Sequence, residues 1–510
     1  MGTTNAEIEA ERAHPEESFI TAGSSVEAFF ADSVILVTGA TGFLGKALLE
    51  KLLRSCPQLA MIFVLLRPKR GQSVEQRFKA LLEDPVFERI RGNVPNIFNK
   101  LCPVKGDVCL PQLGLSNEDK NMLIQRVNIV FHSAATVRFN EPLKVAINLN
   151  TKGTHRVVEL CKSMRNLISM VHVSTAYCNA NRNEIKEMIY TTKVKPYTVI
   201  DMCENLDEET MKVIEGKLME DHPNTYTFTK NLAEQLIFTE GSDLPITIVR
   251  PSIVCAALKE PFPGWVDNIC GLTGIMMEIG RGTARSIMCD SDLVVDIVPV
   301  DYVIDTLICA SWYNATMPSN TVKIYNCTSS SLNPVRWGEL GQFVRKYAIE
   351  SPTKYVVWYP GVMFTTNKFV HNLIVATLHY LPAMLVDLIL RFQGGKPMMV
   401  KITKRFERAV RTGMFFSTHE WTFHRSNMNE LEKHVQASID SDAFNLDITA
   451  FDWDIYVRHY MLGIRKYILK DNPETMNNAR NRLFKLYWVH RLTQLVSFFV
   501  LLKMVRCVSK

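Results

Sequence analysis

The sequence lacks the cysteine and histidine spacings that bind zinc. Its 12 cysteines include no C-x-x-C pair, and none belongs to a Cys/His cluster, which excludes the common structural zinc sites. Several cysteines, such as Cys255, Cys270 and Cys309, lie inside apolar runs. We therefore expect reduced thiols in a protein that faces the cytosol, and no metal site.

A strong charge imbalance, a leader segment and internal repeats are also missing. The net charge is only +6 over 510 residues, so we do not expect a nucleic-acid partner. The chain begins without a charged and then apolar leader, and the sequons at Asn314 and Asn326 are therefore not expected to reach a secretory lumen. No long Pro/Gly/Ser linker separates the parts of the chain, which should pack together.

From residue 33 onward, short β-branched and apolar runs alternate with amphipathic stretches of helical length. This alternation is typical of repeated strand–helix units around a parallel sheet. We predict an α/β fold with a Rossmann-type doubly wound parallel sheet. The expected strands are 34–38, 61–66, 102–108, 128–133, 170–174, 246–249 and 323–327, and the expected crossover helices include 44–54, 142–164 and 227–238.

Beyond residue 351 the alternation stops, and aromatic-rich stretches at 370–390, 415–431 and 455–469 predict a second, mainly helical module. At 510 residues the chain is long enough for both modules to bury a core of their own. The predicted division is a disordered segment at 1–28, a nucleotide-binding reductase domain at 29–350, a helical domain at 351–471 and a membrane-associating tail at 472–510.

A glycine-rich turn follows the first expected strand and opens a helix. Its G-x-x-G-x-x-G pattern places Gly39 in the tight turn, Gly42 where backbone N–H groups can approach a pyrophosphate, and Gly45 where the helix packs on the strand. Such a turn can also be a structural loop. The strand before it and the helix after it favour dinucleotide binding.

The second expected strand ends in Arg67-Pro68-Lys69-Arg70, where an NAD site usually has an acidic residue. Cations at this position can hold the 2′-phosphate of NADPH through charge-assisted hydrogen bonds. The alternative is a solvated basic turn. We predict that NADPH is the cofactor.

Tyr226 and Lys230 form a Y-x-x-x-K pair in the expected sixth crossover helix, and Thr175 follows the fifth expected strand. Spacing of four puts both side chains on one face of a helix. Hydride transfer to a carbonyl carbon builds negative charge on its oxygen, which needs a proton donor and a hydrogen bond. An ammonium group beside a tyrosine favours its phenolate. We predict Tyr226, Lys230 and Thr175 as catalytic residues, with Ser174 as the alternative to Thr175; each alone would also suit an ordinary helix or strand.

In this order, the motifs resemble those of the alcohol-forming fatty acyl-CoA reductases of insects and other eukaryotes, a branch of the extended short-chain dehydrogenase/reductase superfamily. The resemblance covers residues 33 to 471. It is carried by the glycine turn, the Arg67 segment, 171–177, Tyr226 with Lys230, 248–252, 298–301, 415–421 and 451–454. It implies that one NADPH reduces the thioester and that loss of CoA then gives an aldehyde. A second NADPH reduces this aldehyde to the alcohol, and Tyr226 serves both steps.

The resemblance also implies that Asp107 accepts a hydrogen bond from adenine, although an aspartate here can merely cap a turn. Small residues after the fourth strand leave room for the ribose and nicotinamide, whereas His132 is expected to pack in the core. The predicted cofactor contacts are Gly39, Thr41, Gly42, Phe43, Leu44, Gly45, Arg67, Lys69, Arg70, Asp107, Val108, Ala134, Ala135, Tyr226, Lys230, Pro251 and Ile253.

A long-chain acyl-CoA substrate needs an apolar tunnel, and the loop 259–282 is the candidate wall, with plain core as the alternative. The basic residues between 396 and 411 either meet CoA phosphates or lipid headgroups, or form a solvated face. The stretch 370–390 has bilayer length but contains polar residues that favour an interfacial or buried helix. The tail from 486 to 505 is predicted to embed in a membrane, with a surface-lying helix as the alternative.

We therefore expect a membrane-associated enzyme whose catalytic domain faces the cytosol, at the endoplasmic reticulum, peroxisome or lipid droplet. Two competing hypotheses remain at this level. One is another extended short-chain reductase that acts on a sterol, aldehyde or ketone; the other is a non-catalytic scaffold that binds NADPH or lipid. Chain length of the substrate and oligomeric state do not follow from the sequence.

Overall fold

The computed structural model describes residues 25–94, 96–319, 321–449 and 451–508. Most of the segment predicted as disordered, residues 1–24, lies outside this part of the chain. The described chain opens with α1 (Val26–Phe29), whose N-terminus is capped by Ser25. Asp440 accepts hydrogen bonds from the Ser25 hydroxyl at 2.9 Å and the Glu27 backbone at 2.7 Å. The folded core thus includes residues just before position 29.

Seven parallel strands form the central sheet, in the order β12-β7-β5-β4-β1-β2-β3. The order reverses between β1 and β4, which creates the crevice where α/β sheets of this type bind ligands. The fold class is confirmed, and the predicted strands match within a few residues. The strands are β1 (Val34–Thr38), β2 (Met61–Leu66), β3 (Leu101–Lys105), β4 (Ile129–His132), β5 (Ser169–Val173), β7 (Ile246–Pro251) and β12 (Lys323–Cys327).

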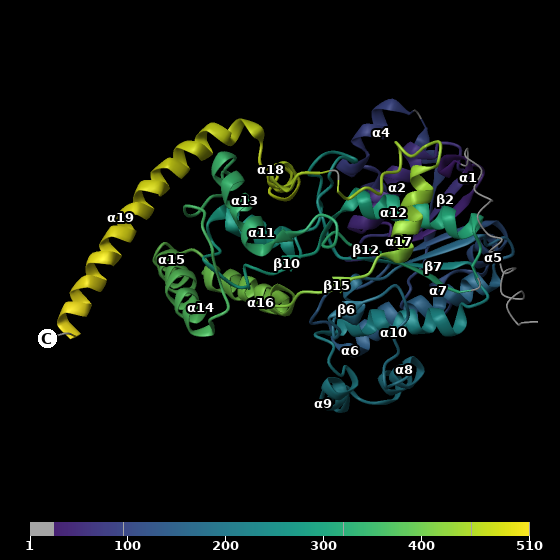
Figure 1. Ribbon diagram of the computed structural model, residues 1–510, viewed down its shortest axis with the longest axis horizontal. Coiled ribbons are helices and arrows are strands. Elements are labelled where there is room, and N and C mark those ends of the chain that lie inside the picture. The colour runs from purple at the N-terminus through teal and green to yellow at the C-terminus, as the bar shows by residue number, and fades with distance from the viewer. Residues whose placement is uncertain (1–24, 95, 320, 450, 509–510) are drawn as a thin grey trace, which may run out of the picture.

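Helices cover both faces of this sheet (Figure 1). One face packs against α2 (Phe43–Ser55) and α12 (Val300–Thr316), and the other against α7 (Lys152–Ser163) and α10 (Thr225–Glu240). Both layers bury continuous apolar clusters, so the sheet is shielded from water as parallel sheets require. The smaller helices of this part are α3 (Val74–Leu82), α4 (Glu88–Asn93), α5 (Asn117–Arg126), α6 (Leu143–Ala146), α8 (Pro196–Asn205), α9 (Glu208–Leu218), α11 (Leu272–Arg281) and α13 (Trp337–Glu350).

Short strands pair outside the main sheet and join its edge to the rest of the chain. The pairs are β6 (Glu184–Ile185) with β15 (Thr422–Phe423), β8 (Ile253–Cys255) with β11 (Ile297–Pro299), β9 (Ser286–Met288) with β14 (Met363–Thr365), and β10 (Val294–Val295) with β13 (Val335–Arg336). Three of these pairs are parallel and the last is antiparallel.

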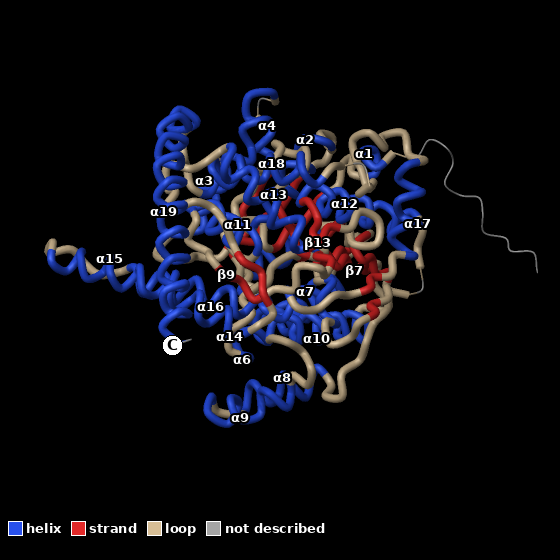
Figure 2. Tube along the Cα trace, turned by 60° about the vertical axis from the view of Figure 1, so that its left-hand side comes forward, coloured by secondary structure: helices blue, strands red, loops and turns tan. Residues whose placement is uncertain are grey.

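The chain after residue 351 is mainly helical, as predicted. Its helices are α14 (Lys368–Ile374), a π-helical turn (Val375–Tyr380), α15 (Leu381–Phe392), α16 (Met399–Ser417), α17 (Ser426–Gln436), α18 (Trp453–Gly463) with a π-helical turn (Ile464–Ile468), and α19 (Met476–Val508). The first three join into one helix, and α19 forms a long rod at the end of the molecule opposite α1 (Figures 1 and 2).

The helix predicted at 415–431 is not continuous: its first and last residues are helical, in α16 and α17, but the middle is not. Helix α16 ends at Ser417, and β15 then pairs with β6. The aromatic residues of this stretch pack on Tyr177, with ring centroids 5.2 Å away for Trp421 and 5.7 Å away for Phe423. This long-range packing overrides the local preference for helix.

Helix α17 then returns to the edge of the main sheet. The side-chain amide of Asn326 in β12 donates to the carbonyl of His424 at 2.8 Å. Arg425 donates to the Thr328 carbonyl at 2.7 Å and to the Tyr302 hydroxyl at 3.0 Å. The segment after residue 351 therefore shares a core with the sheet rather than standing apart from it.

Helix α18 reaches the sheet-bearing part through a close contact between two glycines. A Cβ atom added to Gly463 would lie 1.7 Å from the carbonyl oxygen of Gly264. Gly264 has a φ of +76° and approaches α18 as closely from its own side. Only glycine lets the two backbones meet here.

We predict that Gly463→Ala lowers the free energy of unfolding by about 1–3 kcal/mol or more, because the added methyl group overpacks this contact. Chemical denaturation of the full chain measures the change. The matched control is Gly216→Ala in the last turn of α9, where an added Cβ meets nothing within 4 Å and alanine favours helix by about 1 kcal/mol. Equal stability of the two variants would contradict the close-contact account.

Candidate active site

The glycine-rich turn between β1 and α2 has the geometry of a phosphate cradle. Gly39 has a φ of +76°, and a Cβ there would lie 2.7 Å from the Ser133 hydroxyl. A Cβ on Gly45 would lie 2.3 Å from the Gly39 carbonyl oxygen. Helix α2 begins after Gly42 without a side-chain cap, so its first N–H groups face outward and can hold an anion. Thr41, Phe43 and Leu44 lie on this same turn.

Basic side chains gather beside the turn. Arg77, on α3, donates a hydrogen bond to the Thr41 hydroxyl at 2.9 Å and another to the Arg67 carbonyl. Partial burial lowers the pKa of Lys69, and the neighbouring cations Arg67, Arg77 and Arg70 lower it further. Such crowding of positive charge is unfavourable without an anion, so this group is suited to a phosphate. Arg77 was missed because nothing in its sequence spacing links it to the turn.

Asp107, which follows β3, accepts hydrogen bonds within the protein. One carboxylate oxygen caps the Cys109 backbone at 3.0 Å, and the other accepts from Arg67 at 3.0 Å. Asp107 therefore caps the turn, as the alternative to adenine binding predicted. It also holds Arg67, one of the predicted cofactor contacts, in place. Val108 is buried against Gly153.

The residues after β4 keep small side chains at the crevice, as predicted. Ala134 and Ala135 are half-buried there, and the Ala134 backbone donates to the Thr38 hydroxyl at 3.3 Å. His132 is buried and bonds Thr38 at 2.7 Å and Thr154 at 3.1 Å. It packs in the core and connects strands and helix rather than facing the crevice.

The three predicted catalytic residues come together where β5 and β7 end. Helix α10 begins at Thr225 because the Asn224 side chain accepts from the Thr227 backbone at 2.9 Å. The Lys230 ammonium then donates to the Val173 carbonyl at 2.7 Å. Thr175 is buried and its hydroxyl lies 3.4 Å from the Pro251 carbonyl oxygen, to which it donates.

Burial sets the protonation of the tyrosine and the lysine. It raises the pKa of Tyr226, and a hydrogen bond with Thr175 opposes the rise. Burial lowers the pKa of Lys230 to about 8, and the Glu234 carboxylate opposes that fall. At neutral pH Tyr226 therefore carries its proton, and most Lys230 side chains are ammonium groups. This is the state that can donate a proton to a carbonyl oxygen that gains negative charge.

A buried ion pair fixes α10 against β7. Two nitrogens of Arg250 bind the two carboxylate oxygens of Glu234 at 2.9 and 2.6 Å, and both side chains are almost fully buried. Arg250 also donates to the carbonyls of Lys186 and Met188, at 3.0 and 2.8 Å. Because Glu234 lies one turn after Lys230, this pair holds the catalytic helix in place. Sequence analysis did not assign this role.

Aromatic rings from both parts of the chain form a wall over Tyr226. The Phe139 ring stacks 5.9 Å from the Tyr226 ring and lies 5.3 Å from Phe416 at the end of α16. Phe416 in turn lies 5.1 Å from Tyr177. We call Phe139, Phe416 and Tyr177 the aromatic wall. It was missed because these residues are far apart in the sequence.

The predicted substrate wall at 259–282 is divided between two environments. Trp265 is buried and its ring lies 5.1 Å from Phe43, at the start of α2. Met276 and Met277, on α11, are buried in an apolar cluster with α13 and α18, whereas Ile269 is exposed. The loop thus packs on the nucleotide turn, whereas α11 packs against α13 and α18.

Two family models match the chain. A NAD-binding model described as male sterility protein matches residues 37–307, and a second male sterility protein model matches residues 378–471. Fatty acyl-CoA reductase 1 of Homo sapiens is 39% identical over 462 residues, which cover 91% of this chain and 90% of its own. Fatty acyl-CoA reductase 2 of Mus musculus is 37% identical over 478 residues, which cover 94% and 93%.

Solved structures share the fold at lower identity. The reductase (R) domain of a nonribosomal peptide synthetase from Mycobacterium tuberculosis aligns with a TM-score of 0.57 and 16% identity, covering 87% of this chain and 93% of its own. The terminal R domain of the myxalamid PKS-NRPS biosynthetic pathway aligns with a TM-score of 0.55 and 19% identity, covering 85% and 91%. These matches show the fold alone.

We predict that Glu234→Ala lowers the free energy of unfolding by about 3–5 kcal/mol, because it leaves the Arg250 guanidinium buried without its partner. Chemical denaturation measures the loss. The control is Glu240→Ala at the end of the same helix, where the carboxylate pairs with Lys162 at 3.1 Å nearer the surface and about 1 kcal/mol or less is expected. A loss at Glu234 no larger than at Glu240 would contradict the role given to the buried pair.

Proposed function

The chain belongs to the fatty acyl-CoA reductase family and reduces a fatty acyl-CoA to a fatty alcohol; we propose that it does so with NADPH and with Tyr226, Lys230 and Thr175 at the reacting carbonyl. The convergence of these three residues beside the glycine-rich turn carries the proposal. A long-chain acyl group is the proposed substrate, since an apolar aromatic wall covers Tyr226. Relatives that match over nine tenths of the chain, second module included, favour this reaction over a sterol or aldehyde reductase.

The residues at the site suit two successive reductions of one carbonyl carbon. Bound NADPH supplies a hydride to that carbon in each reduction. In the first, Tyr226 donates its proton to the thioester oxygen and Thr175 donates a hydrogen bond to it. The resulting hemithioacetal expels CoA as the thiol and leaves an aldehyde. In the second, a reprotonated Tyr226 donates to the aldehyde oxygen, which gives the primary alcohol.

Lys230 serves both reductions by its charge. Its ammonium stabilises the tyrosinate that remains after each proton transfer, which lowers the cost of using a buried tyrosine as an acid. The Val173 carbonyl fixes its position at 2.7 Å. The Glu234 carboxylate one turn away favours the charged form. A scaffold that only bound lipid or nucleotide would gain nothing from this arrangement.

NADPH fits the nucleotide end better than NADH does. The glycine cradle leaves no room for a Cβ at Gly39 or Gly45, which suits a closely bound pyrophosphate. Arg67, Lys69, Arg70 and Arg77 are the side chains that would hold the 2′-phosphate by charge-assisted hydrogen bonds. Asp107 pairs with Arg67, and a cofactor without this phosphate would bring no anion to Lys69, Arg70 and Arg77.

Membrane lipid is the proposed partner of the second module. Within the described residues, one helix, Lys368–Phe392, is long and apolar enough to cross a bilayer. It is largely exposed, so the predicted alternative of a buried helix is wrong. Two of its polar residues face the protein: His379 bonds Glu407 of α16 at 2.6 Å, and Asp387 caps the start of α16 through the Met399 backbone at 2.8 Å.

The pairing of this helix with α16 favours a position in the membrane interface. The two helices form a hairpin that projects from the body in Figure 2. Helix α16 carries Lys401, Lys404, Arg405, Arg408 and Arg411 at exposed positions, and moving these cations through a bilayer would be costly. We therefore propose that the apolar side of α15 enters the acyl layer while α16 meets the headgroups.

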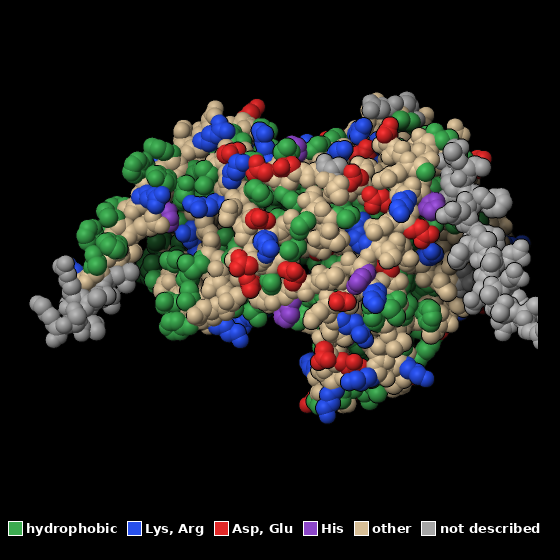
Figure 3. Space-filling view, in the orientation of Figure 1, with side chains coloured by type: hydrophobic (Ala, Val, Ile, Leu, Met, Phe, Trp, Pro, Cys, Tyr) green, Lys and Arg blue, Asp and Glu red, His purple; other side chains and the backbone are tan. Residues whose placement is uncertain are grey.

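The tail helix α19 lies at the same end of the molecule, where exposed apolar side chains gather (Figure 3). Its second half carries Leu492, Leu495, Val496, Phe498 and Phe499, each more than half exposed. The predicted association of the tail with a membrane stays a proposal, with the hairpin as a second contact. The catalytic part would then face the cytosol, on the membrane of the endoplasmic reticulum, the peroxisome or a lipid droplet.

We predict that Tyr226→Phe lowers kcat for reduction of a long-chain acyl-CoA by about 10²–10⁴-fold, because only the proton-donating hydroxyl is lost. The measurement is alcohol formation and NADPH oxidation by detergent-solubilised full chain. Tyr355→Phe removes a hydroxyl from an exposed ring and is expected to leave the rate unchanged. Undiminished reduction by the Tyr226 variant would overturn the assignment.

We predict that Arg67→Ala raises the KM for NADPH by about 10–100-fold and leaves the KM for NADH nearly unchanged, because a charge-assisted hydrogen bond is worth about 1.5–3 kcal/mol. Steady-state kinetics with each cofactor measure the two constants. Lys79→Ala, at an exposed position on α3 near Arg77, is the control and should change neither. An equal rise of the KM values for NADPH and NADH would show that Arg67 does not distinguish the two cofactors.

A further inference from the structure

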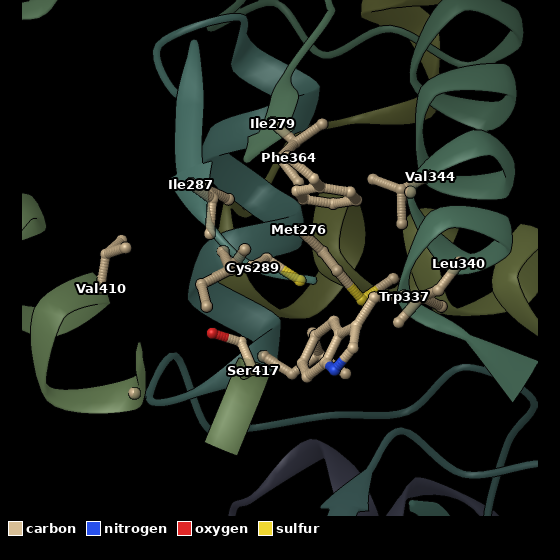
Figure 4. A pocket seen from close by; sticks show the side chains of 14 residues that line it. Met276, Ile279, Ile287, Cys289, Trp337, Leu340, Val344, Phe364, Val410 and Ser417 are labelled. Carbon is tan, nitrogen blue, oxygen red and sulfur yellow. The ribbon is translucent and has the colours of Figure 1, made fainter. Parts of the chain in front are cut away.

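An apolar cavity lies where the two modules meet, between α11, α13 and α16, and is also lined by β9 and β14 (Figure 4). Its free volume is about 50 Å³, several times the roughly 10–15 Å³ that one water molecule needs on this kind of measure. Ser417 and Trp337 lie at one end in Figure 4, and Ile279 and Phe364 at the other. The space is therefore elongated and enclosed by several separate segments.

The walls offer few groups to a polar ligand, chiefly the indole N–H of Trp337, which has no hydrogen-bond partner among the described residues. They are built mainly from aliphatic and aromatic side chains. The hydroxyl of Ser417 already donates to the Met288 carbonyl at 2.7 Å. A cavity lined in this way stays dry, and it gains from an apolar ligand that fills it.

The cavity begins directly behind the aromatic wall. Ser417, which lines it, follows Phe416, and Phe416 contacts Phe139, whose ring stacks on Tyr226. Ile253 makes a second connection, because it packs both on the apolar cluster that surrounds the cavity and on the cluster of Tyr177 and Trp421. Apolar side chains in contact with one another thus connect the reacting group to the cavity.

We propose that this cavity receives the far end of the substrate's acyl chain, and that the absence of a side chain at Gly413 sets how long a chain it admits. The proposal rests on the proposed function, since it assumes an acyl-CoA substrate at Tyr226. Gly413 lies on α16 between Val410 and Ser417, which also line the cavity. Positions three, four and seven apart share one face of a helix, so all three residues face the same space.

Two glycines line the cavity, and their surroundings differ. A Cβ on Gly341 would lie 2.5 Å from the Phe364 ring, so close packing requires glycine there. A Cβ on Gly413 would meet no atom within 4 Å. Packing therefore does not explain Gly413, although glycine in a helix interior is unfavourable. Free space for a ligand does explain it.

The test is Gly413→Leu in the full-length protein, assayed with saturated acyl-CoAs from medium to very long chains. Leucine is a better helix former than glycine and its Cβ would meet no atom within 4 Å, so the variant should fold as the wild type does. We expect kcat/KM to fall about 10-fold or more for the longest chains, since each misplaced methylene costs about that much in a filled pocket. The shortest chains should be reduced as before.

Two further variants complete the experiment. Ala409→Leu adds a similar side chain one turn earlier on α16, at an exposed position outside the cavity lining, and should leave the preference unchanged. Phe364→Ala enlarges the far end of the cavity and should move the preference toward longer chains. The proposal is overturned if both cavity variants keep the wild-type preference for chain length, or if kcat/KM falls equally at all chain lengths.

These outcomes separate the cavity from the reaction itself. If the wild type reduces no acyl-CoA of any length, the proposed function fails. If the wild type reduces acyl-CoAs and neither cavity variant shifts the preference, the reaction stands and only the role of the cavity falls.

Discussion

The buried ion pair between Glu234 and Arg250 is the constraint on which the site depends. It joins the helix that carries Tyr226 and Lys230 to the strand that ends at Pro251, in the interior where a paired charge is held strongly once both partners are present. The same carboxylate favours the ammonium form of Lys230. One interaction thus fixes the helix that carries the candidate catalytic groups and also supports the charge of Lys230 against its burial.

Much of the fold follows from local pattern. Buried parallel strands are short apolar runs, so the seven strands were readable, and the glycine turn was readable because steric demands at Gly39 and Gly45 exclude any other residue. The Tyr226–Lys230 pair was found because its spacing is local to one helix. Their meeting with Thr175 follows from the rule that parallel strands end at one edge of the sheet.

What could not be predicted depends on contacts between distant parts of the chain. Arg77 joins the basic group only through the fold, and Phe416 reaches the tyrosine only because α16 ends beside it. The helix expected at 415–431 is interrupted for the same reason: Trp421 and Phe423 pack on Tyr177, and the two residues 422–423 form a short strand between two helices. Helix α16 connects three regions. Its basic side chains face the proposed lipid headgroups, Gly413 lines the cavity, and Phe416 belongs to the aromatic wall.

The central claim is that one site reduces one carbonyl carbon twice. The most direct measurement uses NADPH that carries deuterium at the transferable position, with a long-chain acyl-CoA and the full-length protein, and determines the label on the alcohol by mass spectrometry. The account predicts an alcohol with two deuterium atoms on its first carbon and one free CoA for each alcohol. Release of a singly labelled aldehyde as the final product, or an unlabelled alcohol, would contradict it.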